Sequence, residues 1–208
     1  MFRFPLMVLL ALNLGACAVV GSDRPLFDAA DARGHDVLRP GLWAMSDEDC
    51  TFDPFAKAKD WNDCANATLV GSATLRELPG KGDDEKAQTL RYVLAGGAPR
   101  VVQVQAPEGE SDPNYAYAGL RALRADEDGR IVEGRVWLAM CEPPPDPKKL
   151  LEHEEKHPPL PAGLVRADKG PGCMATKASA ARAAVERSEP WAKARDMVLT
   201  ARWIRDAD

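Results

Sequence analysis

No cluster of lysine and arginine marks one face of this chain, and its 27 basic side chains are outnumbered by 32 acidic ones, which leaves a net charge of −5. Proteins that bind nucleic acid neutralise phosphates with such clusters, so we expect no nucleic-acid partner. A polybasic segment that would hold the chain on an anionic membrane surface is missing as well.

Sequence signatures of catalysis are also missing. The chain contains neither a Gly-x-Ser-x-Gly nucleophile turn nor a glycine-rich phosphate loop. We therefore predict that the chain is not an enzyme, that it has no catalytic residues and that it needs no cofactor.

Long apolar runs are absent except near the N-terminus. Residues 4–14 are apolar apart from Pro5 and Asn13, and Arg3 is the only charge before them. A lasting membrane helix needs about 20 residues, so this run has the length of a signal-peptide core instead. No second run of spanning length follows it.

The apolar run leads into Leu-Gly-Ala-Cys at residues 14–17, which resembles the lipobox of bacterial lipoproteins. The resemblance covers residues 1–17 only. It implies that residues 1–16 are a removable signal peptide and that Cys17 receives a diacylglycerol and, on its new amine, an acyl chain such as palmitate. Each buried methylene contributes roughly 0.8 kcal/mol, so several chains anchor a protein durably.

Residue 18 is alanine, whereas an aspartate there would resemble the inner-membrane retention signal of enteric bacteria. We therefore expect an outer-membrane protein that faces the periplasm. The alternatives are a soluble secreted protein with an ordinary cleavage site and a short membrane helix.

Apart from Cys17, the chain has four cysteines. An even number in an exported protein indicates two disulfides, and of the three pairings we predict the local one, Cys50–Cys64 and Cys141–Cys173. Each loop would stabilise the fold by roughly 3 kcal/mol. A four-thiolate zinc site is the rival interpretation, but no Cys-x-x-Cys spacing supports it.

The spacing of apolar residues predicts a single α+β domain at residues 39–208, after a lipid-anchored tether at residues 17–38. Apolar residues recur with a period of two, which is typical of strands. We expect a mainly antiparallel sheet, able to curl into a partial barrel, with one C-terminal helix packed on it. Strands are predicted at residues 68–78, 90–94, 101–104, 115–124, 131–141 and 197–205. The helix is predicted at 174–188, ended by Pro190, and a proline-rich insert with a short charged helix occupies 142–162.

A metal site is suggested by His153-Glu154-Glu155-Lys156-His157, which resembles the zincin metalloproteases at three positions. On a helix, the two histidines would share one face and could bind zinc. The charged central residues and the prolines at 158 and 159 depart from that pattern, and no third ligand is evident. We predict a solvated charged helix and keep His153 and His157 as metal candidates. The acidic turn at residues 126–128 could hold calcium, but a solvated turn explains it equally well.

Gly41-Leu42-Trp43 resembles the Gly-x-Trp that opens the first strand of lipocalins. The resemblance implies an eight-stranded barrel that carries a small apolar ligand, with a helix before the last strand. Arg202 would then lie over a tryptophan near the closed end of the barrel.

These features predict a lipid-anchored cell-envelope protein without enzymatic activity, which binds a protein or small ligand or contacts other envelope components. A lipocalin-like carrier of a small apolar ligand is the alternative, and a zinc-dependent hydrolase using His153 and His157 is the third interpretation.

Overall fold

The computed structural model describes residues 18–34, 37–80, 88–107, 113–144, 159–168 and 172–207. Among these residues, no helix has the length and apolar character that crossing a membrane requires. The helices are α2 (Ala29–Ala32), the 3-10 helix η1 (Ala58–Asp60) and α3 (Ala178–Lys193). The strands are β1 (Val20–Ser22), β2 (Gly41–Ser46), β3 (Ala65–Val70), β4 (Thr74–Glu77), β5 (Thr89–Ala95), β6 (Arg100–Gln105), β7 (Tyr115–Ala125), β8 (Ile131–Leu138), β9 (Leu164–Arg166), β10 (Cys173–Ala175) and β11 (Leu199–Arg205).

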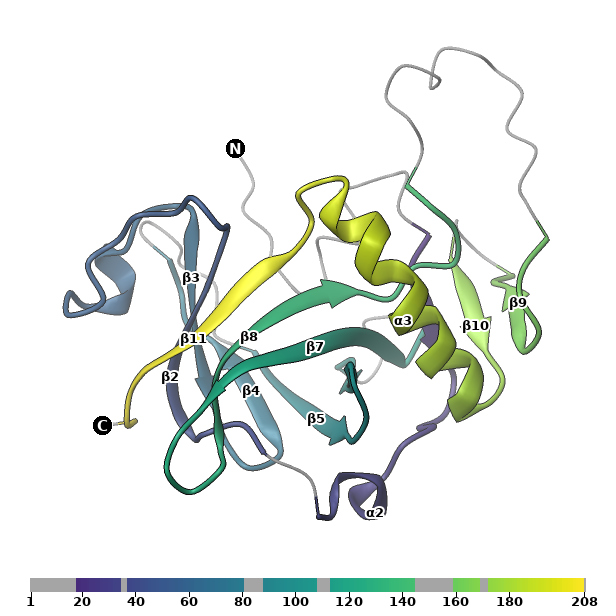
Figure 1. Ribbon diagram of the computed structural model, residues 1–208, viewed down its shortest axis with the longest axis horizontal. Coiled ribbons are helices and arrows are strands. Elements are labelled where there is room, and N and C mark those ends of the chain that lie inside the picture. The colour runs from purple at the N-terminus through teal and green to yellow at the C-terminus, as the bar shows by residue number, and fades with distance from the viewer. Residues whose placement is uncertain are drawn as a thin grey trace, which may run out of the picture.

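Within this part of the chain, eight strands form a closed barrel (Figure 1). Strands β2 to β8 follow one another around it, each antiparallel to the next, and β11 closes it between β8 and β2. On one circuit the registers shift by roughly 12 residues, which tilts the strands strongly against the barrel axis. The mainly antiparallel sheet is confirmed, and the barrel is complete rather than partial.

The two ends of the barrel differ. Turns at residues 71–73, 96–99 and 126–130 lie at one end, which we call the short-turn end. Because neighbouring strands are antiparallel, the longer connections, 47–64, 78–88, 106–114 and 139–198, all leave from the other end, the long-loop end. The predicted strand at 68–78 is in fact β3 and β4, since the chain turns back after Gly71.

A contiguous apolar cluster fills the barrel. Every second residue of a strand points inward, and the inward-facing set includes Trp43, Tyr92, Val102, Leu120 and Val136. The most deeply buried members are Ile131, Trp43 and Leu120, which are at most 2% exposed. Burying each such side chain contributes about 1.5–3 kcal/mol, so this cluster is a main source of the stability of the barrel.

Helix α3 covers part of the outer face of the barrel, as predicted for the C-terminal helix (Figure 1). Its small residues, such as Ala181 and Ala184, are fully buried and let the helix lie close to β7 and β8. Nε1 of Trp137 donates to the carbonyl O of Val185 at 2.9 Å. The predicted bounds of 174–188 are wrong at both ends: the helix begins at Ala178, because Cys173–Ala175 is strand β10, and it continues past Pro190 to Lys193.

A small sheet of β1, β10 and β9 extends from β7, with β1 and β10 parallel. We expected residues 17–38 to be a tether, but β1 belongs to the sheet and Phe27 is 3% exposed. The side chain of Gln103 explains this placement, because it accepts from the N–H groups of Leu26 and Phe27 and donates to the carbonyl O of Phe27. The folded body therefore begins at residue 18.

Both predicted disulfides are present, Cys50–Cys64 and Cys141–Cys173. The first closes the segment between β2 and β3, which packs on the outer wall of the barrel through Phe52 and Trp61, whose ring centroids are 4.9 Å apart. The second joins the chain after β8 to β10.

Candidate functional site

Partly exposed side chains line the long-loop end of the barrel. On six strands, the inward-facing residue nearest this end is neither exposed nor fully buried, and we call this set the rim. The rim consists of Asn66, Glu77, Leu90, Ala116, Leu138 and Leu199. On β2 and β6 the corresponding residues, Met45 and Val104, are buried, at 8% and 5% exposure.

A packed floor lies beneath the rim. On six of the eight strands the inward-facing side chain two residues deeper is buried, and those of Trp43, Tyr92, Val136 and Ala201 are at most 7% exposed. Thr68 and Leu75, on β3 and β4, stay partly exposed. The hydroxyl of Tyr92 donates to the carbonyl O of Gly71 at 3.1 Å, and burial raises the pKa of Tyr92 to about 12, so the phenol stays neutral at physiological pH. The floor is therefore apolar and uncharged.

Two tryptophans close the short-turn end. Trp43 on β2 and Trp203 on β11 are direct cross-strand neighbours. Nε1 of Trp43 donates to the carbonyl O of Arg39 at 2.8 Å, and Nε1 of Trp203 donates to that of Pro40 at 3.0 Å. The guanidinium of Arg39 lies 3.7 Å from the centroid of the Trp203 ring. Protein groups thus occupy this end, and the long-loop end is where a ligand could approach the interior.

The arginine over this tryptophan was predicted wrongly. Arg202 lies between the inward-facing Ala201 and Trp203, so strand alternation turns it outward, where it lies 4.0 Å from Glu133. Arg39 lies over Trp203 instead. It is brought there because the chain before β2 crosses the end of the barrel, where the N–H of Arg39 donates to the carbonyl O of Ile131.

Polar and apolar residues occupy separate parts of the rim. Asn66 and Glu77 lie on the adjacent strands β3 and β4, and Thr68 is the direct cross-strand neighbour of Glu77. The rest of the rim is leucine and alanine. Such a ring can contact a mainly apolar molecule and offer hydrogen bonds to one polar group on one side.

Several predicted sites lie outside the described residues, namely the lipidation site Cys17 and the metal candidates His153 and His157. Within the described ranges, no three His, Cys, Asp or Glu side chains are grouped so that they could hold a metal ion.

In the acidic turn, the carboxylate of Asp126 accepts from the N–H groups of Asp128 and Arg130 and pairs with the Arg130 guanidinium at 2.9 Å. Desolvation acts to raise the pKa of Asp126, but the bonds from Arg130 outweigh it and hold the pKa below its usual value. Arginine thus takes the place that calcium would need.

Sequence patterns did not identify the rim. Its residues come from six strands between positions 66 and 199 and share no motif. The one sequence signal for these residues is the alternation within each strand. It shows that Leu90 and Leu199 face the same side of their strands as the residues two positions further on. It does not show that the six strands end at the same opening of the barrel.

Comparisons of the chain with protein-family models, with curated proteins and with solved structures found no match. We therefore infer function from the residues themselves.

Proposed function

We propose that this chain is a lipid-anchored binding protein of the cell envelope without enzymatic activity, and that the rim holds the apolar part of a small ligand. The observation that carries this proposal is the set of partly exposed, inward-facing leucines, Leu90, Leu138 and Leu199, above a buried apolar floor. Leaving apolar side chains partly in water costs free energy that a ligand would recover by covering them.

An envelope location is supported by two independent features. The N-terminal pattern that ends at Cys17 is typical of lipoprotein signal peptides, and we place the protein at the outer membrane, facing the periplasm. The two disulfides need an oxidising compartment to form and persist, as the periplasm provides.

The ligand that fits the rim is mainly apolar and has one polar group. Leucine and alanine side chains would cover its apolar part, while Asn66, Thr68 and Glu77 would face its polar group across β3 and β4. The amide of Asn66 and the hydroxyl of Thr68 can each donate to or accept from that polar group.

A lipocalin-like carrier that encloses its ligand is the second candidate. The closed eight-stranded barrel with its longer connections at one end supports it. The packed floor leaves less room for a ligand inside, since Trp43 and Tyr92 already fill the middle of the barrel. We therefore favour binding at the rim over deep enclosure.

Titration with a neutral apolar fluorophore that carries one amine, such as N-phenyl-1-naphthylamine, tests the proposal. We expect Leu90→Asn and Leu199→Asn each to weaken binding about tenfold, because a lost leucine contact of roughly 1.4 kcal/mol changes affinity by that factor. Leu123→Asn is the matched control, since Leu123 is 49% exposed on the hairpin at the short-turn end. Equal weakening by all three changes, or no binding to the unchanged protein, would contradict the proposal.

The depth of binding separates the two candidates. Binding at the rim should shift the NMR signals of the Leu90 and Leu199 methyl groups and leave the indole N–H of Trp43 unchanged. A large shift of the Trp43 indole would favour the enclosing carrier instead.

A further inference from the structure

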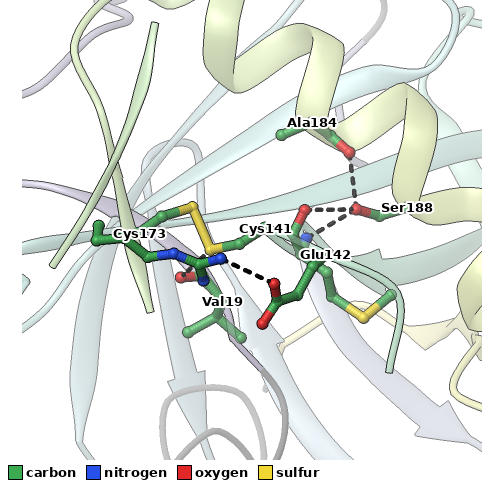
Figure 2. The surroundings of a disulfide bond; sticks show 8 residues. Val19, Cys141, Glu142, Cys173, Ala184 and Ser188 are labelled. Atoms are coloured by element: carbon green, nitrogen blue, oxygen red, sulfur yellow. Dashed lines mark hydrogen bonds and ion pairs between the residues drawn. A yellow bond between two sulfur atoms is a disulfide. The ribbon is translucent and has the colours of Figure 1, made fainter. Parts of the chain in front are cut away.

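Backbone hydrogen bonds hold the first described residues on both sides, and Val19 lies beside the Cys141–Cys173 disulfide (Figure 2). The carbonyl O of Ala18 accepts from the N–H of Cys141 at 2.7 Å, and the carbonyl O of Val19 accepts from the N–H of Cys173 at 3.1 Å. Ala18 is 3% exposed and Val20 is fully buried. The chain therefore enters the folded body at residue 18 and has no freedom to move away from it.

The Cys141–Cys173 disulfide joins the two segments that hold this entry point. Cys173 is the β10 neighbour of Val20, and Cys141 bonds to Ala18. Neither flanking segment can separate from the other without breaking a covalent bond. Residues 18–20 are thus held by hydrogen bonds to two segments that a disulfide joins to each other.

The distance from Cys17 to the folded body follows from covalent geometry. Adjacent Cα atoms are about 3.8 Å apart, so any group on residue 17 is attached within one residue of a rigid sheet. Had residues 18–38 been a flexible tether, their root-mean-square length would have been roughly 25 Å. Because residues 18–22 belong to the folded body, no such flexible segment separates residue 17 from it.

We propose that the acylated protein lies directly on the bilayer, and that the lipid headgroups face the anchor corner, residues 18–20, 141–143, 166–168 and 172–173. Residues 18, 20, 141 and 173 are the buried part of this corner, and residues 142–143 and 166–168 form its exposed surface. This inference rests on the proposed acylation of Cys17. Beyond the anchor itself, the inference assigns one face of the fold to the membrane. A domain on a flexible tether would instead present all of its faces to the membrane in turn.

The chemistry of the anchor corner suits a headgroup layer. Nη2 of Arg166 donates to a carboxylate oxygen of Glu142 at 3.1 Å, so these two charges largely cancel (Figure 2). Pro143 is exposed, and Val165 on the adjacent edge strand β9 is 50% exposed. The exposed carboxylate of Asp168 is the remaining acidic group of the corner, and it can lie beside the cationic groups of zwitterionic headgroups, while the paired charge and the exposed apolar side chains cost little there.

The test uses the lipidated protein, produced from the full chain and placed in nanodiscs that contain lipids with a gadolinium chelate on the headgroup. Paramagnetic relaxation should erase the backbone amide signals of the anchor corner and spare those of the β7–β8 turn at residues 126–130. A matched variant carries an insertion of about 12 Gly and Ser residues between Cys17 and Ala18, with a root-mean-square length of roughly 20 Å. In that variant the selective loss should disappear while the amide shifts of the barrel stay unchanged.

Intact-mass measurement separates the possible failures. A protein without acyl chains would refute the proposed anchor and this inference together. An acylated protein whose signal losses are unselective, or are the same with and without the insertion, would overturn the inference and leave the anchor standing.

Discussion

Glu189 is a buried carboxylate that ties α3 to the barrel. Nε of Arg121 on β7 donates to it at 2.9 Å, and Nζ of Lys193 lies 2.9 Å from it. The bonds from Arg121 act most strongly and, with Lys193, lower the pKa of Glu189 from 4.5 to about 2, although burial acts to raise it. A carboxyl whose pKa is lower in the folded state stabilises the fold above its unfolded-state pKa, and this contribution is lost as the pH falls through the folded-state value.

We therefore expect the free energy of unfolding to fall as the pH drops from about 4.5 to about 2. Glu189→Gln should lower the stability at pH 7 by about 1–2 kcal/mol, less than the pKa shift alone implies, because the Arg121 side chain is 41% exposed and solvent screens the pair. Urea unfolding at several pH values measures this. Glu186→Gln, an exposed position on the same helix, is the control. If the unchanged protein and Glu189→Gln lost stability in parallel over this pH range, the assignment would be wrong.

At the scale of elements, α3 shows packing that overrides a local stop signal. Proline inside a helix removes one backbone hydrogen bond and crowds the preceding turn, which is why the sequence predicted an end before Pro190. The helix continues because the next turn still has buried contacts and backbone bonds, with Ala192 fully buried and the N–H of Ala194 donating to the carbonyl O of Pro190 at 3.1 Å. Pro190 itself is exposed, so its ring meets no other element.

Replacing Pro190 with alanine should stabilise the protein by about 1 kcal/mol. The change restores the N–H that the helix lacks, and the greater freedom of the unfolded chain offsets part of the gain. Chemical denaturation provides the measurement, and Glu186→Ala, which should alter stability by less than about 0.5 kcal/mol, is the comparison. If Pro190→Ala were instead less stable than the unchanged protein, the backbone hydrogen bond that proline removes would not be what limits the stability of the last turn of α3.

For the whole molecule, the barrel closes through two long-range pairings of β11, one with β2 and one with β8. The disulfides lie outside the barrel wall and hold two different additions to it. Cys50–Cys64 closes the segment on the outer wall near β3, while Cys141–Cys173 holds the small sheet at the end of β8. Their loops differ in length, with sequence separations of 14 and 32 residues.

Paired cysteine-to-alanine variants should therefore differ in stability. We expect Cys50→Ala with Cys64→Ala to cost roughly 3 kcal/mol, and Cys141→Ala with Cys173→Ala to cost roughly 4 kcal/mol, because a longer closed loop restricts the unfolded chain more. Equilibrium unfolding in urea gives both values under identical conditions. The reverse order would show that native contacts around the shorter loop outweigh chain entropy.

Much of the fold followed from local patterns. Alternation of period two located β5, β6, β7, β8 and β11 to within a few residues, because each of these strands is apolar on its inner side. The hairpin after Gly71 was missed, although Gly71-Ser72 is a turn signal, because the apolar alternation of residues 68–78 was assigned to one strand. The candidate site was not predicted, because no rim residue has a chemical pattern of its own.

The order of residues alone determined where most strands of the barrel run and the composition of the N-terminal segment, since each depends on neighbours in sequence. It left three cysteine pairings open, and the predicted local pairing was confirmed by the structure. Only the tertiary structure decided that the sheet closes, that residues 18–22 belong to it and that the rim residues meet at one end. Those outcomes depend on contacts between positions far apart in the chain, such as Gln103 with Phe27 and β11 with β2, and no local periodicity carries that information.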